Sequence, residues 1–229
     1  ERIGRLFNKK YCHFEGSIHE QVRTMQGKEP DTFPIPLTFY HEGYVGESDK
    51  RMKATRNLEM LLHDLSLKGP SPYIYFQLGQ NYISLNDMEK AAHYYKLGLD
   101  LNADPNSDFV QSMAETYGYC LVDLARYDTA MSLRDKYDLF SHRADFVFLM
   151  GTLYQKKGEY AKALDEFKKA TALTAYARTG VNSYRANYHI GEIYESMGDL
   201  PQARTYYKKC GDYDPALRRL RDLADREND

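Results

Sequence analysis

Two histidine–glutamate pairs are the residues of this chain whose types and spacing could do chemistry. His19 precedes Glu20 and His41 precedes Glu42, each pair within a β-prone segment near the start of the chain. Imidazole and carboxylate groups can bind a divalent metal ion or transfer a proton. A His-Glu pair in a strand is, however, typical of a surface or cross-strand polar pair. The pairs alone therefore do not predict an active site.

One aspartate pair, Asp212-Tyr213-Asp214, has the Asp-x-Asp spacing that can hold a metal ion and a diphosphate. It directly precedes Pro215, where a solvated turn is the expected structure. The seven histidines are dispersed along the chain, and the sequence predicts no metal cluster from them. Any catalytic role in this chain thus depends on the elements that would position His19 and Glu20.

A helical hairpin over residues 144–170 is the clearest element. Its two helices carry apolar residues three and four positions apart, which gives each helix one apolar stripe. Gly158 lies between them, and glycine at the end of a helix lets the chain reverse without a Cβ clash. One such hairpin cannot bury both of its faces, so it needs copies of itself.

Four copies are present, and each has a glycine, a turn residue seven positions later and an alanine twelve positions later. The sets are Gly79, Asn86 and Ala91; Gly118, Ala125 and Ala130; Gly151, Gly158 and Ala163; and Gly191, Gly198 and Ala203. Small residues at these positions would let two helix backbones approach closely. The pattern resembles the tetratricopeptide repeat (TPR), a two-helix unit that stacks into a superhelix. The second copy is the weakest, since Arg134 stands where an aromatic residue normally packs.

The resemblance implies an all-α fold, a TPR-type α-α superhelix with a short β-prone N-terminal remnant. Within residues 1–47, Ile3–Phe7 and Tyr11–Glu15 are expected to form a hairpin, and so few strands do not make a domain. The expected divisions are a remnant edge of another domain (1–47), a linker or capping helix (48–70), four repeats (71–215) and a C-terminal capping helix (216–229). The repeats are placed at about 72–105, 106–140, 144–179 and 184–215.

An ordered series of short motifs gives a second resemblance. It runs through Arg5-Leu6-Phe7, Phe14 to Glu20, His41 to Tyr44, Lys53, Arg56-Asn57 and Leu61-Leu62. The series resembles the C-terminal edge of the catalytic domain in bacterial family 2 glycosyltransferases that carry TPR repeats. The resemblance implies that His19 faces a divalent metal ion, Mg²⁺ or Mn²⁺, and the diphosphate of a nucleotide sugar. Glu20 would orient the acceptor or act as a base, and His41-Glu42 would be structural.

The nucleotide-sugar half of such an enzyme is not found in these residues. No Gly-rich phosphate loop or βαβ unit occurs, and Asp212-Tyr213-Asp214 is a poor substitute for the core Asp-x-Asp. We therefore expect a piece of a longer transferase that is inactive and needs no cofactor by itself. The alternative is a stand-alone TPR adaptor or scaffold with no enzymatic role.

The concave face of the superhelix is the second candidate site. The helical register places eight candidate binding residues there: Tyr73, Phe76, Gln80, Tyr119, Phe148, Gln155, Arg185 and Tyr188. Rigid aromatic rings among amides and carboxylates suit an extended peptide. The expected partner is a protein or peptide, or a protein or glycan acceptor, and a solvated groove with structural tyrosines is the alternative. Because Arg185 is the one cation in this register, a clamp for a C-terminal carboxylate is not expected.

Composition excludes several classes of partner. The 229 residues are 42% hydrophobic with a net charge of −2, which does not favour nucleic acid. No apolar run approaches the ~20 residues of a membrane-spanning helix. Cys12, Cys120 and Cys210 have no CxxC spacing and favour a reducing, cytoplasmic location.

Overall fold

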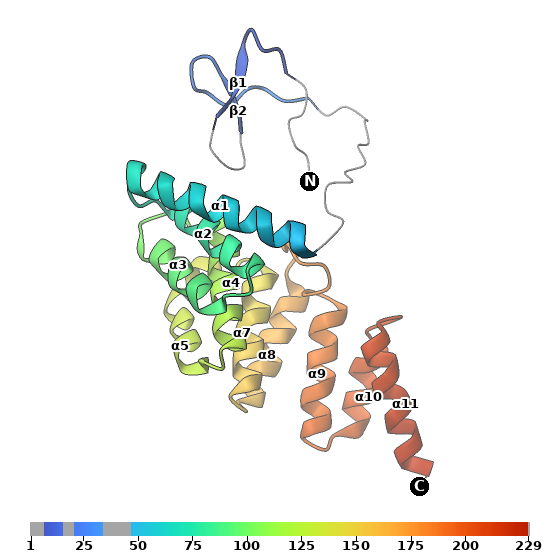
Figure 1. Ribbon diagram of the computed structural model, residues 1–229. Helices are drawn as coiled ribbons and strands as arrows, with labels where there is room; N and C mark the ends of the chain where they lie inside the picture. Colours follow the sequence, from blue (N-terminus) through green and yellow to red (C-terminus); the bar gives the residue numbers. More distant parts are fainter. Residues whose placement is uncertain (1–6, 16–20, 34–46, 229) are drawn as a thin grey trace.

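The computed structural model describes residues 7–15, 21–33 and 47–228 (Figure 1). Two short strands are followed by a long run of helices. The elements are β1 (Cys12–Glu15), β2 (Gln21–Thr24), α1 (Glu47–Lys68), α2 (Pro72–Ser84), α3 (Met88–Asp100), α4 (Asp108–Asp123), α5 (Tyr127–Met131), the 3₁₀ helix η1 (Ser132–Lys136), α6 (Tyr137–Phe140), α7 (Ala144–Lys156), α8 (Tyr160–Ala172), α9 (Tyr184–Ser196), α10 (Leu200–Lys208) and α11 (Asp214–Asn228).

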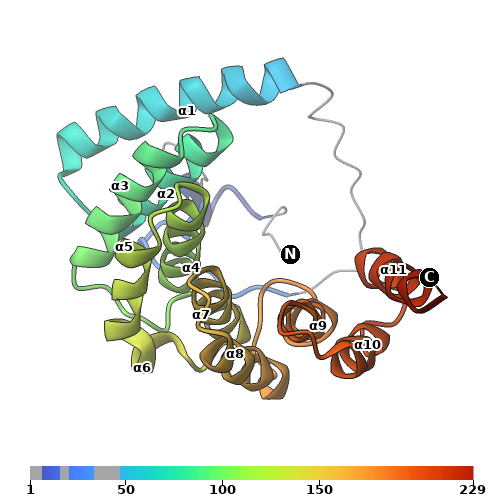
Figure 2. The ribbon, with the colours of Figure 1, turned by 90° about the horizontal axis from the view of Figure 1, so that it is seen from below.

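The helices stack in antiparallel pairs along a curved path, and the most extensive pairings are α2 with α3, α7 with α8 and α9 with α10. Figure 2 shows α2, α4, α7 and α9 on the inner side of the curve, with α3, α5, α8 and α10 outside them. The inner helices therefore form the concave face. The predicted TPR-type superhelix is confirmed.

A close contact at Gly79, Gly151 and Gly191 joins the two helices of a pair, whereas Gly118 lies closest to Leu149 of α7, in the next repeat. A Cβ added at Gly151 would lie 2.9 Å from the Phe167 ring, and one at Gly191 would lie 2.5 Å from the Tyr207 ring. Gly79 meets Tyr95 in the same way. All four repeated alanines are fully buried. The predicted role of the small residues is confirmed, because a larger side chain at the glycine would push its partner helix away.

The four predicted turn residues all adopt the left-handed backbone conformation. Their φ angles are 61° at Asn86, 55° at Ala125, 74° at Gly158 and 80° at Gly198. In each turn the next residue donates its backbone N–H to the carbonyl five positions earlier, as Glu159 does to Tyr154 at 2.9 Å. This hydrogen bond satisfies a carbonyl at the end of the first helix.

The second repeat departs from the others in its outer helix, which is divided into α5, η1 and α6. Leu133 is buried there and Arg134 is exposed. A Cβ at Gly118 would lie 3.0 Å from Leu133. Since Arg134 cannot fill an apolar space, Leu149 of α7 and Leu133 lie beside Gly118 instead, and the outer helix has tighter 3₁₀ winding at Leu133.

The described N-terminal residues include one pair of strands. β1 and β2 form an antiparallel pair in which Cys12 lies opposite Thr24 and Phe14 lies opposite Val22. The predicted partner of Tyr11–Glu15 was Ile3–Phe7, of which only Phe7 is described. Phe7 contributes an edge-to-face ring contact with Phe14, at 4.9 Å between centroids.

The C-terminal end also differs in detail. Pro215 lies in the first turn of α11 and does not stop the second helix of repeat four, which ends at Lys208. Proline is well tolerated in a first turn because its missing N–H would have no partner there. Arg219 of α11 is ion-paired to Glu195 of α9.

At the other end, α1 buries Ala54 and Leu61. The neighbouring Leu62 is 38% exposed. None of the helices in the described ranges is both long and apolar enough to cross a bilayer.

Candidate functional site

The residues predicted to be catalytic, His19 and Glu20, lie outside the described residues, as do His41 and Glu42. Their roles stay predictions. Among the residues that the structure does describe, no three His, Cys, Asp or Glu side chains gather where they could hold a metal ion. Asp214 begins α11 and forms an ion pair with Arg218 at 2.6 Å.

A cavity of about 190 Å³ opens between the inner helices at repeats two to four. Four of the predicted binding residues line it: Tyr119 from α4, Phe148 from α7, and Arg185 and Tyr188 from α9. The other residues that line it are Arg178, Val181, His189 and Tyr213. The structure thus brings together half of the predicted set and adds residues from outside the inner helices.

The remaining predicted binding residues do not line this cavity. Tyr73 and Phe76 pack instead around Phe109, with ring centroids 5.4 and 5.8 Å from it. Gln80 is half-buried on the same helix, α2. Gln155 lies 3.5 Å from the Glu192 carboxylate, across the α7–α9 interface.

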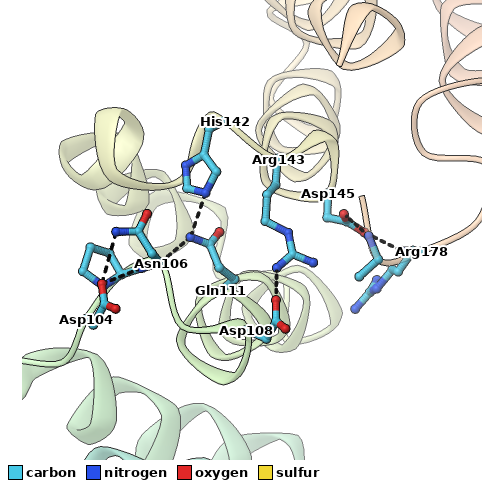
Figure 3. Close-up of polar contacts among 10 residues, drawn as sticks. Asp104, Asn106, Asp108, Gln111, His142, Arg143, Asp145 and Arg178 are labelled. Carbon is cyan, nitrogen blue, oxygen red and sulfur yellow. Dashed lines mark hydrogen bonds and ion pairs between the residues drawn. The ribbon is translucent and has the colours of Figure 1, made fainter. Parts of the chain in front are cut away.

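The α8–α9 loop, residues 173–183, supplies the part of the cavity that sequence reasoning missed. Asp145, at the first turn of α7, is 1% exposed and accepts hydrogen bonds from the backbone N–H groups of Ala177 and Arg178 at 2.7 and 2.8 Å (Figure 3). The loop is therefore fixed against α7. The 40-residue spacing from Gly151 to Gly191 signalled extra residues here, but not their path.

Arg178 is positioned by this loop. Its guanidinium lies 4.4 Å from the centre of the Tyr119 ring, within the range of a cation–π contact. Figure 3 shows the backbone of Arg178 against the Asp145 carboxylate. The concave face therefore has a second cation, and the expectation that Arg185 is the one cation there is wrong.

Glu115 is a buried acid on α4, one turn before the cavity residue Tyr119. It is 3% exposed, and its Oε1 has no hydrogen-bond partner among the described residues. Burial, and after it the nearby Asp145 carboxylate, raise the pKa of Glu115 to about 7. Arg143 and Arg178 act in the opposite direction, and Arg143 is itself ion-paired to Asp108 at 2.8 Å (Figure 3).

The two glutamates of α9, Glu192 and Glu195, interact with neighbouring side chains. Glu192 lies 3.0 Å from His189 Nδ1. Burial acts to raise the pKa of Glu192, but the neighbouring His189 and the hydrogen bond from Gln155 outweigh it and leave this pKa below its ordinary value. Glu195 accepts a hydrogen bond from Tyr207 at 2.8 Å and pairs with Arg219.

Comparison with protein families agrees with this architecture. The model described as "Tetratricopeptide repeat" matches residues 72–105, 144–175 and 184–217. The chain carries tetratricopeptide repeats. The matched segments correspond to the first, third and fourth copies, and they leave out the second copy with its divided outer helix.

Solved structures show the same fold. A crystal structure of MamA is 21% identical to the chain over 80% of this chain and 99% of that one, with a TM-score of 0.59. A MamA fragment from Desulfovibrio magneticus RS-1 is 18% identical, covering 74% and 94%, with a TM-score of 0.58. YrrB, titled a TPR protein with an unusual peptide-binding site, is 17% identical, covering 76% and 89%, with a TM-score of 0.60. The search of curated protein sequences gave no match.

Proposed function

We propose that this TPR region binds an extended segment of a partner protein along its concave face, with the cavity between α4, α7 and α9 as the main contact. The observation that carries the proposal is the convergence of Tyr119, Phe148, Arg185 and Tyr188 on one cavity. Aromatic and arginine side chains contribute most of the binding energy in many protein interfaces. The size of the cavity, about 190 Å³, suits one side chain of such a segment.

The fold supports the same function. Interactions between proteins are what the TPR architecture supports best, and YrrB is a TPR protein with a peptide-binding site. A superhelix of stacked hairpins offers an extended concave surface that a peptide can follow.

Selection from a library tests the proposal. Random 12-residue segments, displayed between constant flanks so that no chain end is free, are selected on the immobilised 229-residue protein. Selected segments should bind with micromolar affinity, and Arg185→Glu should weaken them at least tenfold. The control, Arg134→Glu, places the same change on the exposed outer face of repeat two and should leave binding unchanged. Equal binding by both variants, or no enrichment at all, contradicts the proposal.

The finer hypothesis, that the repeats belong to a family 2 glycosyltransferase, rests on the motif series around His19 and Glu20 and stays a prediction. The family match and the structural matches concern the repeats and favour the adaptor alternative. Reading the parent gene upstream of Glu1 discriminates the two. About 200 further codons with alternating strand and helix patterns and an Asp-x-Asp motif support the transferase, whereas a start codon directly before Glu1 supports the adaptor.

A further inference from the structure

The acidic and basic side chains around the cavity differ in how many partners they have within the protein. Four carboxylates of the inner helices α4, α7 and α9 have a polar neighbour within the protein or a raised pKa. Asp145 accepts hydrogen bonds from the α8–α9 loop, Glu192 lies 3.0 Å from His189 Nδ1, Glu195 pairs with Arg219, and burial raises the pKa of Glu115 to about 7.

The two cations that line the cavity, Arg178 and Arg185, differ from these carboxylates. Within residues 7–15, 21–33 and 47–228, neither the Arg178 nor the Arg185 guanidinium takes part in a side-chain hydrogen bond or an ion pair. Arg185 is exposed, and Arg178 contacts the face of the Tyr119 ring. A guanidinium has five N–H donors, so both side chains retain donors toward the cavity.

The setting makes these donors suitable for an anion. The ring contact with Tyr119 and the fixed α8–α9 loop hold the Arg178 guanidinium in place before any ligand arrives, which lowers the entropic cost of binding. Phe148 and Tyr188 form apolar walls that strengthen a charge-assisted hydrogen bond by excluding water. A planar guanidinium matches the two oxygens of a carboxylate.

We infer that this cavity binds the carboxylate of an aspartate or glutamate side chain within the partner segment, through Arg178 and Arg185. The inference rests on the proposed function and deepens it, because it names the chemistry of the segment. An apolar residue next to the acid would contact the rings of Phe148 and Tyr188.

The test uses the segments selected above. The expected result is enrichment of Asp or Glu beside an apolar residue. Two synthetic peptides with blocked ends, one with the selected Glu and one with Gln in its place, are then compared by fluorescence anisotropy. The Glu peptide should bind at least tenfold more tightly, and its affinity should fall as salt concentration rises.

Variants of the protein assign the effect to the cavity. Arg178→Gln and Arg185→Gln should each remove most of the difference between the Glu and Gln peptides, whereas Arg134→Gln on the outer face should preserve it. Arg185 is exposed, so its variant reports on binding even where Arg178→Gln alters the loop.

The outcomes separate the two proposals. Selected segments that bind but show no preference for Glu over Gln overturn the carboxylate inference and leave the proposed function standing. Binding of the Gln peptide that is restored when its C-terminus is left unblocked also overturns it, because the carboxylate would then come from a chain end. Failure to select any segment overturns both.

Discussion

The contact between paired helices is repeated along this protein, whereas the contacts on its concave face differ from repeat to repeat. At the helix contact, Gly79, Gly151 and Gly191 each meet an aromatic ring sixteen positions later. On the concave face, side chains at equivalent positions of different repeats make different contacts. Ile83 and Glu195 each follow their glycine by four residues, yet Ile83 packs in the apolar core whereas Glu195 pairs with Arg219.

The difference reflects two kinds of constraint. In every repeat the two helices pack together with the same backbone geometry, so small residues occur at the same positions of each repeat. A polar side chain on the concave face is satisfied by whichever neighbour the next repeat or loop supplies, and those neighbours differ along the chain. The following variants test this contrast.

The largest effect is expected for Gly151→Leu. The new side chain would overlap the Phe167 ring, so overpacking should lower the free energy of unfolding by about 3 kcal/mol. Chemical denaturation measures the loss. Lys168→Leu, an exposed change on α8, is the control and should stay within about 0.5 kcal/mol of the parent. An unchanged midpoint for Gly151→Leu would mean that the helix register is wrong.

The second effect concerns Glu115 and pH. Its pKa lies at about 7 in the folded chain against an ordinary 4.5, so between these values the folded state binds the proton more tightly than the unfolded state. The contribution of Glu115 to stability is therefore full below about pH 4.5 and is lost as pH rises through 7.

Glu115→Gln should accordingly be more stable than the parent by about 3 kcal/mol at pH 8, because a pKa of about 7 against 4.5 corresponds to ~1.4 kcal/mol for each pH unit between the two values, and by less than about 1 kcal/mol at pH 5. Asp165→Asn, at an exposed position of α8, should show no such difference. Denaturation at the two pH values decides, and a gain that is independent of pH would argue against a proton on Glu115.

A third comparison uses two buried tyrosines at equivalent positions. The Tyr207 hydroxyl donates to Glu195 at 2.8 Å, whereas the Tyr95 hydroxyl has no partner among the described residues. Tyr207→Phe should cost about 1.5 kcal/mol because it removes a hydrogen bond to a charged group. Tyr95→Phe should be neutral or slightly stabilising. Thermal unfolding of the two variants measures the contrast, and equal losses would show that the hydrogen bond does not distinguish them.

The smallest effect is expected at the turns. Ala125 adopts φ 55° without being glycine, and Gly158 adopts φ 74° at the equivalent position. A Cβ is disfavoured in this conformation. Gly158→Ala should therefore destabilise the protein by about 1 kcal/mol and Ala125→Gly should stabilise it by about 0.5 kcal/mol. Shifts of the same sign in both variants would contradict the shared turn geometry.

Sequence reasoning recovered the repeats because their signals are local. Gly158 and Ala163 lie within one hairpin, and the period of the apolar stripe shows which faces pack. It failed at Leu133 because a switch to 3₁₀ winding depends on which apolar residue can reach the space beside Gly118. It also expected a solvated turn before Pro215, where α11 already begins at Asp214, since proline can follow one helix or lie in the first turn of the next.

At the candidate site, the inner helices were predicted but the loop was not. Tyr119, Phe148 and Arg185 follow from the helical register, which fixes the face a side chain occupies. Arg178 lines the cavity because Asp145, 33 residues earlier, accepts hydrogen bonds from two backbone N–H groups of the loop.

The sequence by itself determined the helical hairpins, their turns and the glycine contacts, because these depend on residues a few positions apart and on side-chain size. Only the tertiary structure decided which charges on the concave face are satisfied and which remain for a partner. That outcome depends on partners brought from distant parts of the chain, such as Glu195 with Arg219 and Asp145 with the α8–α9 loop.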